Sequence, residues 1–210
     1  NGRGGSINLN SDYDLIISNT DIQASGNNGG DIQIKSTRHQ VEFDNSVIQT
    51  NGSSGRGGTI NISANSDNLI INGTIEVKGA TLGGGVTLTA THIQLNNETN
   101  INATGNLGGG YVLVGGDWQG SNGTYQATTV LMNQSVTIDA SATENGNGGK
   151  VVLWSDLSKA NGWTNVYGGI YAKAGVNGGD GGKIETSGHS LDIGGATINA
   201  EAAAGKSGLC

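Results

Sequence analysis

The sequence predicts an all-β protein, a right-handed parallel β-helix, and three observations lead to this prediction. Glycine pairs followed by an aliphatic residue recur along all 210 residues. The stretches after these pairs alternate apolar and polar side chains, which is the period of a strand with one buried face. No stretch shows a helical period, and the chain has 39 glycines and no proline. An interior glycine costs a helix about 1 kcal/mol, so helices are not expected.

The glycine pairs mark the repeat. They occur in RGGSINL from Arg3, NGGDIQI from Asn28, RGGTINI from Arg56, GGGVTLT from Gly83, GGGYVLV from Gly108, NGGKVVL from Asn147 and DGGKIET from Asp180. The last glycines are Gly5, Gly30, Gly58, Gly85, Gly110, Gly149 and Gly182, which gives spacings of 25, 28, 27, 25, 39 and 33 residues. We interpret them as corners where a positive φ or a close backbone excludes a Cβ. A weaker eighth start lies at Gly205.

Each regular repeat is expected to hold three short strands separated by Gly, Asn and Ser turns. The expected strands are 31–35, 40–44 and 46–50 in the second repeat, 59–63, 68–72 and 74–78 in the third, and 86–89, 92–95 and 99–103 in the fourth. Parallel strands need a crossover, and here the rest of the repeat supplies it. Each repeat therefore forms one coil whose strands pair with their counterparts in the adjacent coils.

The number of repeats predicts the size of the solenoid. Seven or eight coils of about 25 residues, rising about 4.8 Å each, would form a rod roughly 35–40 Å long. The absence of proline agrees with this fold, because a strand bonded on both sides needs every N–H. Right-handed coiling follows from the general handedness of parallel crossovers. We expect one β-helix segment over 1–210, with regular coils in 1–110, lengthened coils in 111–182 and a terminal coil in 183–210.

The two long repeats predict two loops extruded from the coils. The first loop follows a strand at 111–114 and precedes one at 128–132, and the second occupies 154–164. Their aromatic residues are Trp118, Tyr125, Trp154 and Trp163. These side chains could bind a ligand, since loops on rigid scaffolds carry function. We favour the alternative, in which the indoles cover the apolar surface of the lengthened coils.

Composition and motifs exclude several functions. Ten Lys and Arg against 17 Asp and Glu cannot supply the basic surface that nucleic acids need. No apolar run has the ~20 residues of a transmembrane helix, and a single cysteine, Cys210, allows no disulfide framework. The histidines His39, His92 and His189 lie in different repeats, so no metal or other cofactor is expected. The carboxylates considered for catalysis are Asp117, Asp156, Asp180 and Glu185. They form no clear pair, and we expect no enzyme.

Seven N-x-S/T triplets are candidate glycan acceptors. They begin at Asn51, Asn61, Asn72, Asn97, Asn102, Asn122 and Asn133. Chance placement of the 25 Asn and 37 Ser and Thr residues predicts about 4.4 triplets, so the excess is too small to be informative. The alternative is that these asparagines stabilise corners through bonds from the side chain to the backbone.

The second half of the chain resembles the filamentous-haemagglutinin-like exoproteins of bacterial two-partner secretion, the family of the HMW adhesins. The resemblance rests on VLVGGDWQG from Val112, SVTIDASA from Ser135, NGGKVVLWSD from Asn147, GIYAKAG from Gly169, GDGGKIETSGH from Gly179, LDIGG from Leu191 and AGKSGL from Ala204. It implies a secreted surface fibre with a right-handed β-helical stalk. It also implies export by a signal peptide and an outer-membrane two-partner-secretion transporter. A chain without proline lacks the family's Asn-Pro-Asn motif, which places this segment downstream of, or at the tail of, the secretion domain.

The expected function is therefore that of a structural and adhesive segment, outside the cell, that holds a binding tip or builds a fibre for adhesion or biofilm matrix. Head-to-tail self-association is a further expectation, because uncapped solenoid ends expose strand edges. Host or matrix glycans are the expected ligands if the segment itself binds. The alternative function is a β-helix that binds or cleaves carbohydrate through the loops of Trp118 and of Trp154–Trp163.

Overall fold

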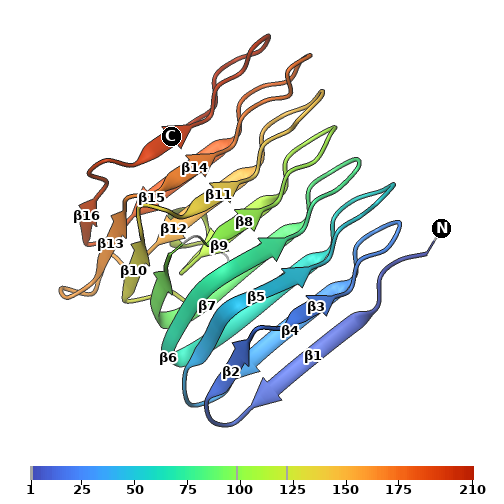
Figure 1. Ribbon diagram of the computed structural model, residues 1–210. Helices are drawn as coiled ribbons and strands as arrows, with labels where there is room; N and C mark the ends of the chain where they lie inside the picture. The colour runs from blue at the N-terminus through green and yellow to red at the C-terminus, as the bar shows by residue number, and fades with distance from the viewer. Residues whose placement is uncertain (1, 98, 122) are drawn as a thin grey trace.

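The computed structural model describes residues 2–97, 99–121 and 123–210, and it is built almost entirely of strands. All the strands belong to one sheet, and every pairing between them is parallel (Figure 1). Within the described residues the only helix is one 3-10 turn, η1. No helix in the described part of the chain is long and apolar enough to cross a membrane. The predicted all-β, parallel architecture is confirmed.

The strands follow one another with short connections. They are β1 (Ser6–Ser11), β2 (Leu15–Ser18), β3 (Asp21–Gln23), β4 (Asp31–Ser36), β5 (Val41–Gln49), β6 (Thr59–Glu76), β7 (Gly85–Leu95), β8 (Asn100–Asn102), β9 (Tyr111–Val114), η1 (Trp118–Gly120), β10 (Thr129–Met132), β11 (Thr137–Asp139), β12 (Lys150–Trp154), β13 (Trp163–Val166), β14 (Gly169–Tyr171), β15 (Lys183–Ser187), β16 (Ser190–Asp192) and β17 (Thr197–Asn199).

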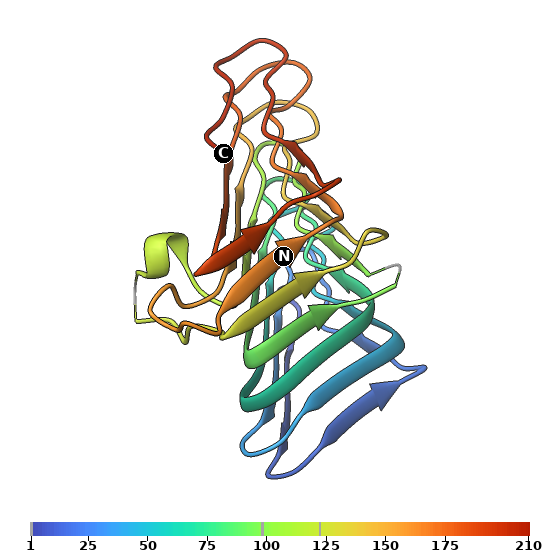
Figure 2. The same cartoon turned by 90° about the vertical axis from the view of Figure 1, so that its left-hand side faces the viewer.

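Each strand pairs with its counterparts one repeat away. The first strands of successive coils lie side by side in the order β1, β4, β6, β7, β9, β12 and β15. The two ends of the chain consequently lie at opposite ends of the stack (Figure 1). This arrangement is that of a parallel β-helix, and Figure 2 shows its coils obliquely, with the C-terminal coils toward the viewer.

The core fills the inside of the coils. In-register pairing places one inward aliphatic residue of each coil against the next, in the column Ile7, Ile32, Ile60, Val86, Val112, Val151 and Ile184. The inward Phe43 and Ile71 are fully buried next to each other in the second strand layer. Stacking equivalent side chains keeps the register, because a slip of one residue would turn every aliphatic side chain outward.

The three strands per coil are separate in the first coil and again from β9 onward, but some of them merge in the coils between. β9, β10 and β11 form one such set, but β6 runs without a break through all three strands predicted at 59–78. The backbone stays extended through both bends. The bends appear as register shifts, between Ala64 and Asn68 in the pairing with β7 and between Asp44 and Ser46 of β5 in the pairing with that strand. The prediction of separate strands is therefore wrong for this coil. It is also wrong in part for the second and fourth coils, because β5 joins the strands predicted at 40–44 and 46–50 and β7 joins those predicted at 86–89 and 92–95.

The predicted corner glycines lie where adjacent coils touch. A Cβ on Gly30 would lie 2.0 Å from the carbonyl oxygen of Gly5, and one on Gly58 would lie 1.9 Å from that of Gly30. Gly110, Gly149 and Gly182 meet the preceding coil in the same way, at 2.0, 1.9 and 2.1 Å. At Gly5, in the first coil, nothing lies within 4 Å. None of these glycines has a positive φ, so the close backbone excludes the side chain.

The prediction that Gly85 is one of these corner glycines is wrong. Gly84 takes the corner, where a Cβ would lie 2.1 Å from the carbonyl oxygen of Gly58. Gly85 is instead the first residue of β7, paired with Thr59 and Tyr111. Three consecutive glycines allow either alignment in the sequence, and the stacking of the inward Val86 on Ile60 and Val112 selects the second.

Candidate functional site around the two loops

The alternation of apolar and polar residues breaks down in β9 and β12, where the first loop covers the outer face of the sheet. Leu113 and Val152 point outward at paired positions, yet they are 8% and 0% exposed. Together with Trp154 and the partly buried Trp118 they form a second apolar cluster, separate from the core, which we name the outer cluster. Figure 2 shows the loop with η1 standing out from the coils beside these strands.

The loop turns sharply at η1, and Asp117 holds this turn. The Asp117 carboxylate, in a side chain 9% exposed, accepts hydrogen bonds from the Trp118 amide and from Lys150 Nζ, each at 2.7 Å. Gln119 has a φ of 53°, in the left-handed region, and two glycines with positive φ, Gly115 and Gly120, flank this part of the loop. The Asp117 carboxylate is thus part of the structure of the loop and bonds to a lysine of the next coil.

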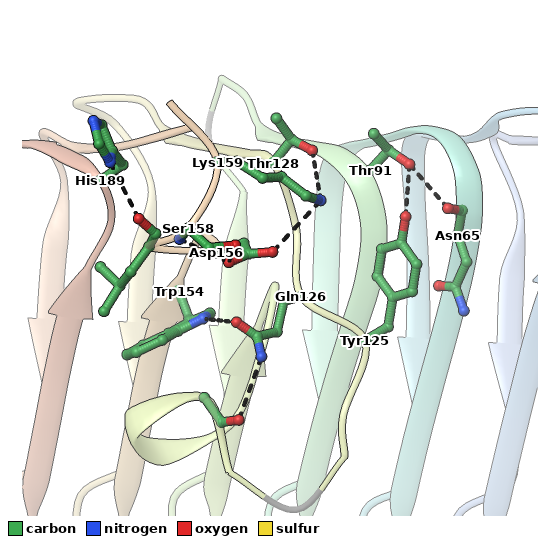
Figure 3. A network of polar contacts seen from close by, with 12 residues as sticks. Asn65, Thr91, Tyr125, Gln126, Thr128, Trp154, Asp156, Ser158, Lys159 and His189 are labelled. Atoms are coloured by element: carbon green, nitrogen blue, oxygen red, sulfur yellow. Dashed lines mark hydrogen bonds and ion pairs between the residues drawn. The ribbon is translucent and has the colours of Figure 1, made fainter. Parts of the chain in front are cut away.

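Trp154 joins the loop to the sheet. Its side chain is 5% exposed, and the indole Nε1–H donates to Gln126 Oε1 at 2.8 Å (Figure 3). The Gln126 amide in turn contacts the Gly120 carbonyl oxygen at 3.4 Å. A buried indole with its N–H bonded has no free face for a sugar ring, so Trp154 serves packing.

The loop is anchored on both sides of its own coil. The Tyr125 hydroxyl is 2.8 Å from Thr91 Oγ1, in the preceding coil (Figure 3). In the other direction the Gln119 amide donates to Glu185 Oε2 at 2.8 Å, and Lys183 Nζ lies 5.7 Å from the centre of the Trp118 ring. The loop therefore spans several coils.

Polar contacts, some within the loop and some to residues outside it, hold the second loop, residues 155–162. Lys159 Nζ donates to Thr128 Oγ1 at 3.0 Å and lies 4.0 Å from Asp156 Oδ2 (Figure 3). Hydrogen bonds from the hydroxyl and the amide of Ser158 lower the pKa of the Asp156 carboxyl below its usual 3.8. His189, from the next coil, is bonded to the Leu157 carbonyl oxygen at 3.1 Å.

The predicted aromatic residues do not form one patch. Trp118 and Trp154 belong to the outer cluster, whereas Trp163 begins β13 and pairs with Thr129 and Ser190 in a different strand layer. Trp154 ends β12, so the two tryptophans expected inside the second loop lie in the strands at its edges.

The groups considered for catalysis have structural partners. Asp117 and Glu185 hold the first loop, and Asp180 accepts the Lys206 amide at 2.8 Å. His92 Nδ1 lies 2.9 Å from Thr129 Oγ1, and the His39 ring stacks on Tyr13. Across 2–97, 99–121 and 123–210, no three His, Cys, Asp or Glu side chains gather in a way that could hold a metal ion.

The candidate glycan acceptors differ in how their side chains are used. Asn51, Asn72 and Asn133 donate their Nδ2 to neighbouring coils, to Glu76, Asp44 and Asn96 respectively. Asn102 accepts from Thr104 through its Oδ1. Asn61 and Asn97 are exposed and have no such side-chain bond among the described residues. Asn122 lies outside the described residues.

The comparisons with known proteins agree with this architecture. No family model matches the chain, and no curated protein does. Among solved structures the chain is similar to the HMW1 secretion domain from Haemophilus influenzae, with 27% sequence identity and a TM-score of 0.74. The similarity covers 90% of this chain and 48% of that one, so the chain spans about half the length of that structure.

Proposed function

We propose that the chain is a non-enzymatic structural and adhesive segment of a secreted bacterial surface protein. The observation that carries the proposal is the similarity to the HMW1 secretion domain, which extends over 90% of the chain. The motifs from Val112 to Leu209 support the same family. A segment of this kind is exported through an outer-membrane transporter and acts outside the cell, as part of a rod or fibre.

The proposed mechanism is mechanical. Backbone hydrogen bonds run along the solenoid axis from each coil to the next, and the inward aliphatic columns bury the faces between them. Pulling the ends apart would therefore break a whole layer of bonds at a time. We take the coil to be right-handed, as parallel crossovers generally are.

Self-association is part of the proposal. β1 pairs with β4 alone among the described strands, so its other edge is free to accept a strand. A second copy or a neighbouring coil of the parent protein would satisfy this edge, which would place the segment within a longer fibre.

The test is genetic and uses the natural protein. An antibody against the segment should detect it on the cell surface or in the medium of the producing bacterium, and deletion of the partner transporter should abolish that signal. Retention of the protein inside cells that have an intact transporter would contradict the proposal. Electron microscopy of the purified chain would then distinguish single short rods from end-to-end fibres.

A further inference from the structure

An open groove of about 600 Å³ runs along the glycine corners of the early coils, away from both loops. Backbone from the glycine pairs forms its floor, and Arg3, Arg56, Thr59, Leu82 and Tyr111 are among its walls. This volume is within the range of ligand sites, roughly 300–1,000 Å³. We refer to it as the Arg56 groove.

At one end of the groove the chain pairs an arginine with its own carboxylate. Arg3 Nη2 donates to Asp31 Oδ2 at 2.6 Å, and Thr59 Oγ1 donates to Asp31 Oδ1 at 2.7 Å. Asp31 is the first residue of β4, one coil beyond Arg3. Both oxygens of this carboxylate are therefore engaged, and the Arg3 charge is balanced.

Two coils further on, the arginine is present and the carboxylate is missing. Arg3 and Arg56 both directly precede a glycine pair, in equivalent positions of their coils. The register aligns Asp31, Thr59, Gly85 and Tyr111 as first residues of successive strands. Gly85 therefore occupies the same position relative to Arg56 that Asp31 occupies relative to Arg3, at the start of the first strand one coil later. Arg56 is exposed, and among the described residues its guanidinium has no hydrogen-bond or ion-pair partner.

Tyr111 takes the space that the absent side chain leaves. A Cβ built on Gly85 would lie 2.1 Å from Tyr111 Cζ and 2.4 Å from its hydroxyl oxygen, so the ring lies directly over Gly85. Tyr111 is 37% exposed, and Leu82 beside it in the groove is 39% exposed. The groove thus presents a guanidinium, a phenol hydroxyl and an accessible apolar surface together.

We propose that the Arg56 groove binds an acidic sugar, whose carboxylate takes the place that Asp31 occupies beside Arg3. A guanidinium recognises a carboxylate through two parallel N–H bonds, and the Tyr111 hydroxyl supplies a further donor. The exposed Tyr111 ring and Leu82 suit the apolar face of a sugar ring. One unpaired guanidinium in the groove, on a chain of net charge −7, does not suit a nucleic acid.

The experiment measures binding of tetragalacturonate to the full chain by isothermal titration calorimetry or NMR. The parent should bind with a Kd of about 1 mM or tighter, and Arg56→Gln should weaken binding at least about tenfold. Arg38→Gln is the matched control, because Arg38 is an exposed arginine beyond the other end of β4, and it should bind like the parent. Gly85→Asp should also abolish binding, since its side chain would displace the Tyr111 ring and its carboxylate would pair with Arg56.

Two further ligands, the methyl ester of tetragalacturonate and tetra-aspartate, complete the test. The methyl ester of tetragalacturonate has the same rings without charge and should not bind. Equal binding of the ester, or of tetra-aspartate, would overturn the acidic-sugar assignment. Parent-like binding by Arg56→Gln with unchanged circular dichroism would also overturn it, as would no saturable binding by the parent up to about 10 mM. None of these results depends on how the protein is exported, so the proposed function is tested separately.

Discussion

The amide of Gln119 donates a hydrogen bond of 2.8 Å to the carboxylate of Glu185, although 66 residues separate the two. Gln119 belongs to the loop after β9, and Glu185 lies in β15, with β12 between these strands in the sheet. This contact, with Tyr125 on Thr91, ties together coils that otherwise bond only to their immediate neighbours. The first loop therefore acts as a strap along the outside of the stack.

Removing the Glu185 carboxylate should loosen this strap. Glu185→Ala deletes the acceptor of the Gln119 amide, and we expect the free energy of unfolding to fall by about 1–2 kcal/mol in urea. Glu144→Ala is the control, because Glu144 is exposed and its side chain has no hydrogen bond among the described residues. Equal loss in the two variants would show that the contact does not stabilise the fold.

Trp154 should matter more for stability than Trp163. Trp154 is 5% exposed and packs in the outer cluster, whereas Trp163 is half-buried. We expect Trp154→Ala to cost about 3–5 kcal/mol and Trp163→Ala about 1 kcal/mol, measured by denaturant unfolding with far-UV circular dichroism. If the carbohydrate alternative were right, Trp154→Ala would instead lose sugar binding while keeping its stability.

Replacing one buried threonine of the core should increase the stability of the protein. Thr50 is fully buried, and its Oγ1 has no hydrogen-bond partner among the described residues. Thr50→Val keeps the shape and removes the unsatisfied hydroxyl, so the free energy of unfolding should rise by about 1 kcal/mol. Thr99 is equally buried, but its hydroxyl has carbonyl acceptors within reach, Ile71 O at 2.9 Å and Asn96 O at 2.6 Å. Thr99→Val should therefore lower stability, and the same sign for both variants would contradict this reasoning.

Both glycines of a corner pair lie against backbone of the stack, and Gly109 is an example. A Cβ on Gly109 would lie 1.8 Å from the Ala140 carbonyl oxygen, inside the stack. We expect Gly109→Ala to lower the free energy of unfolding by about 3 kcal/mol or more, because the two coils must move apart. Gly5→Ala is the control, since nothing lies within 4 Å of that Cβ. A melting temperature of Gly109→Ala close to that of the parent would show that the corner is not tightly packed.

Much of the fold follows from local patterns, because a solenoid repeats one environment. The glycine pairs and the alternation in 31–35 and 86–89 reflect one buried face per strand, and this periodicity is visible without knowing the partners. The exact corner at Gly84 could not be predicted, since three glycines in a row permit two registers and only stacking between coils decides.

The candidate site was harder to predict for a similar reason. Apolar runs in VLV at Val112 and VVLW at Val151 indicate strands buried on both faces, and that signal could have predicted the outer cluster. The contact of Gln119 with Glu185 joins positions 66 residues apart and has no local signature. The unpaired charge of Arg56 likewise becomes visible only when the register sets Gly85 against Asp31.

Ser207 should prevent another coil of the same shape from stacking on the last one. Gly208 meets the Gly182 carbonyl oxygen at 2.0 Å, as Gly182 meets that of Gly149, so Ser207 stands where Gly181 stands one coil earlier. At Gly181 a Cβ would lie 1.9 Å from the carbonyl oxygen of Ala200, at the end of the same repeat, and the serine Cβ would meet the end of an added repeat in the same way.

An extended chain tests this prediction. When a second copy of residues 185–208 is joined after Cys210, the added coil should remain sensitive to protease if position 207 is Ser. Ser207→Gly should make it resistant and raise the melting temperature, because the stack then continues with its regular corner. Ser207→Ala is the matched control and should behave like serine, since the Cβ alone causes the clash. If the added coil were equally resistant to protease in all three chains, the corner would tolerate a side chain at position 207. Ser207 would then not prevent a further regular coil from stacking.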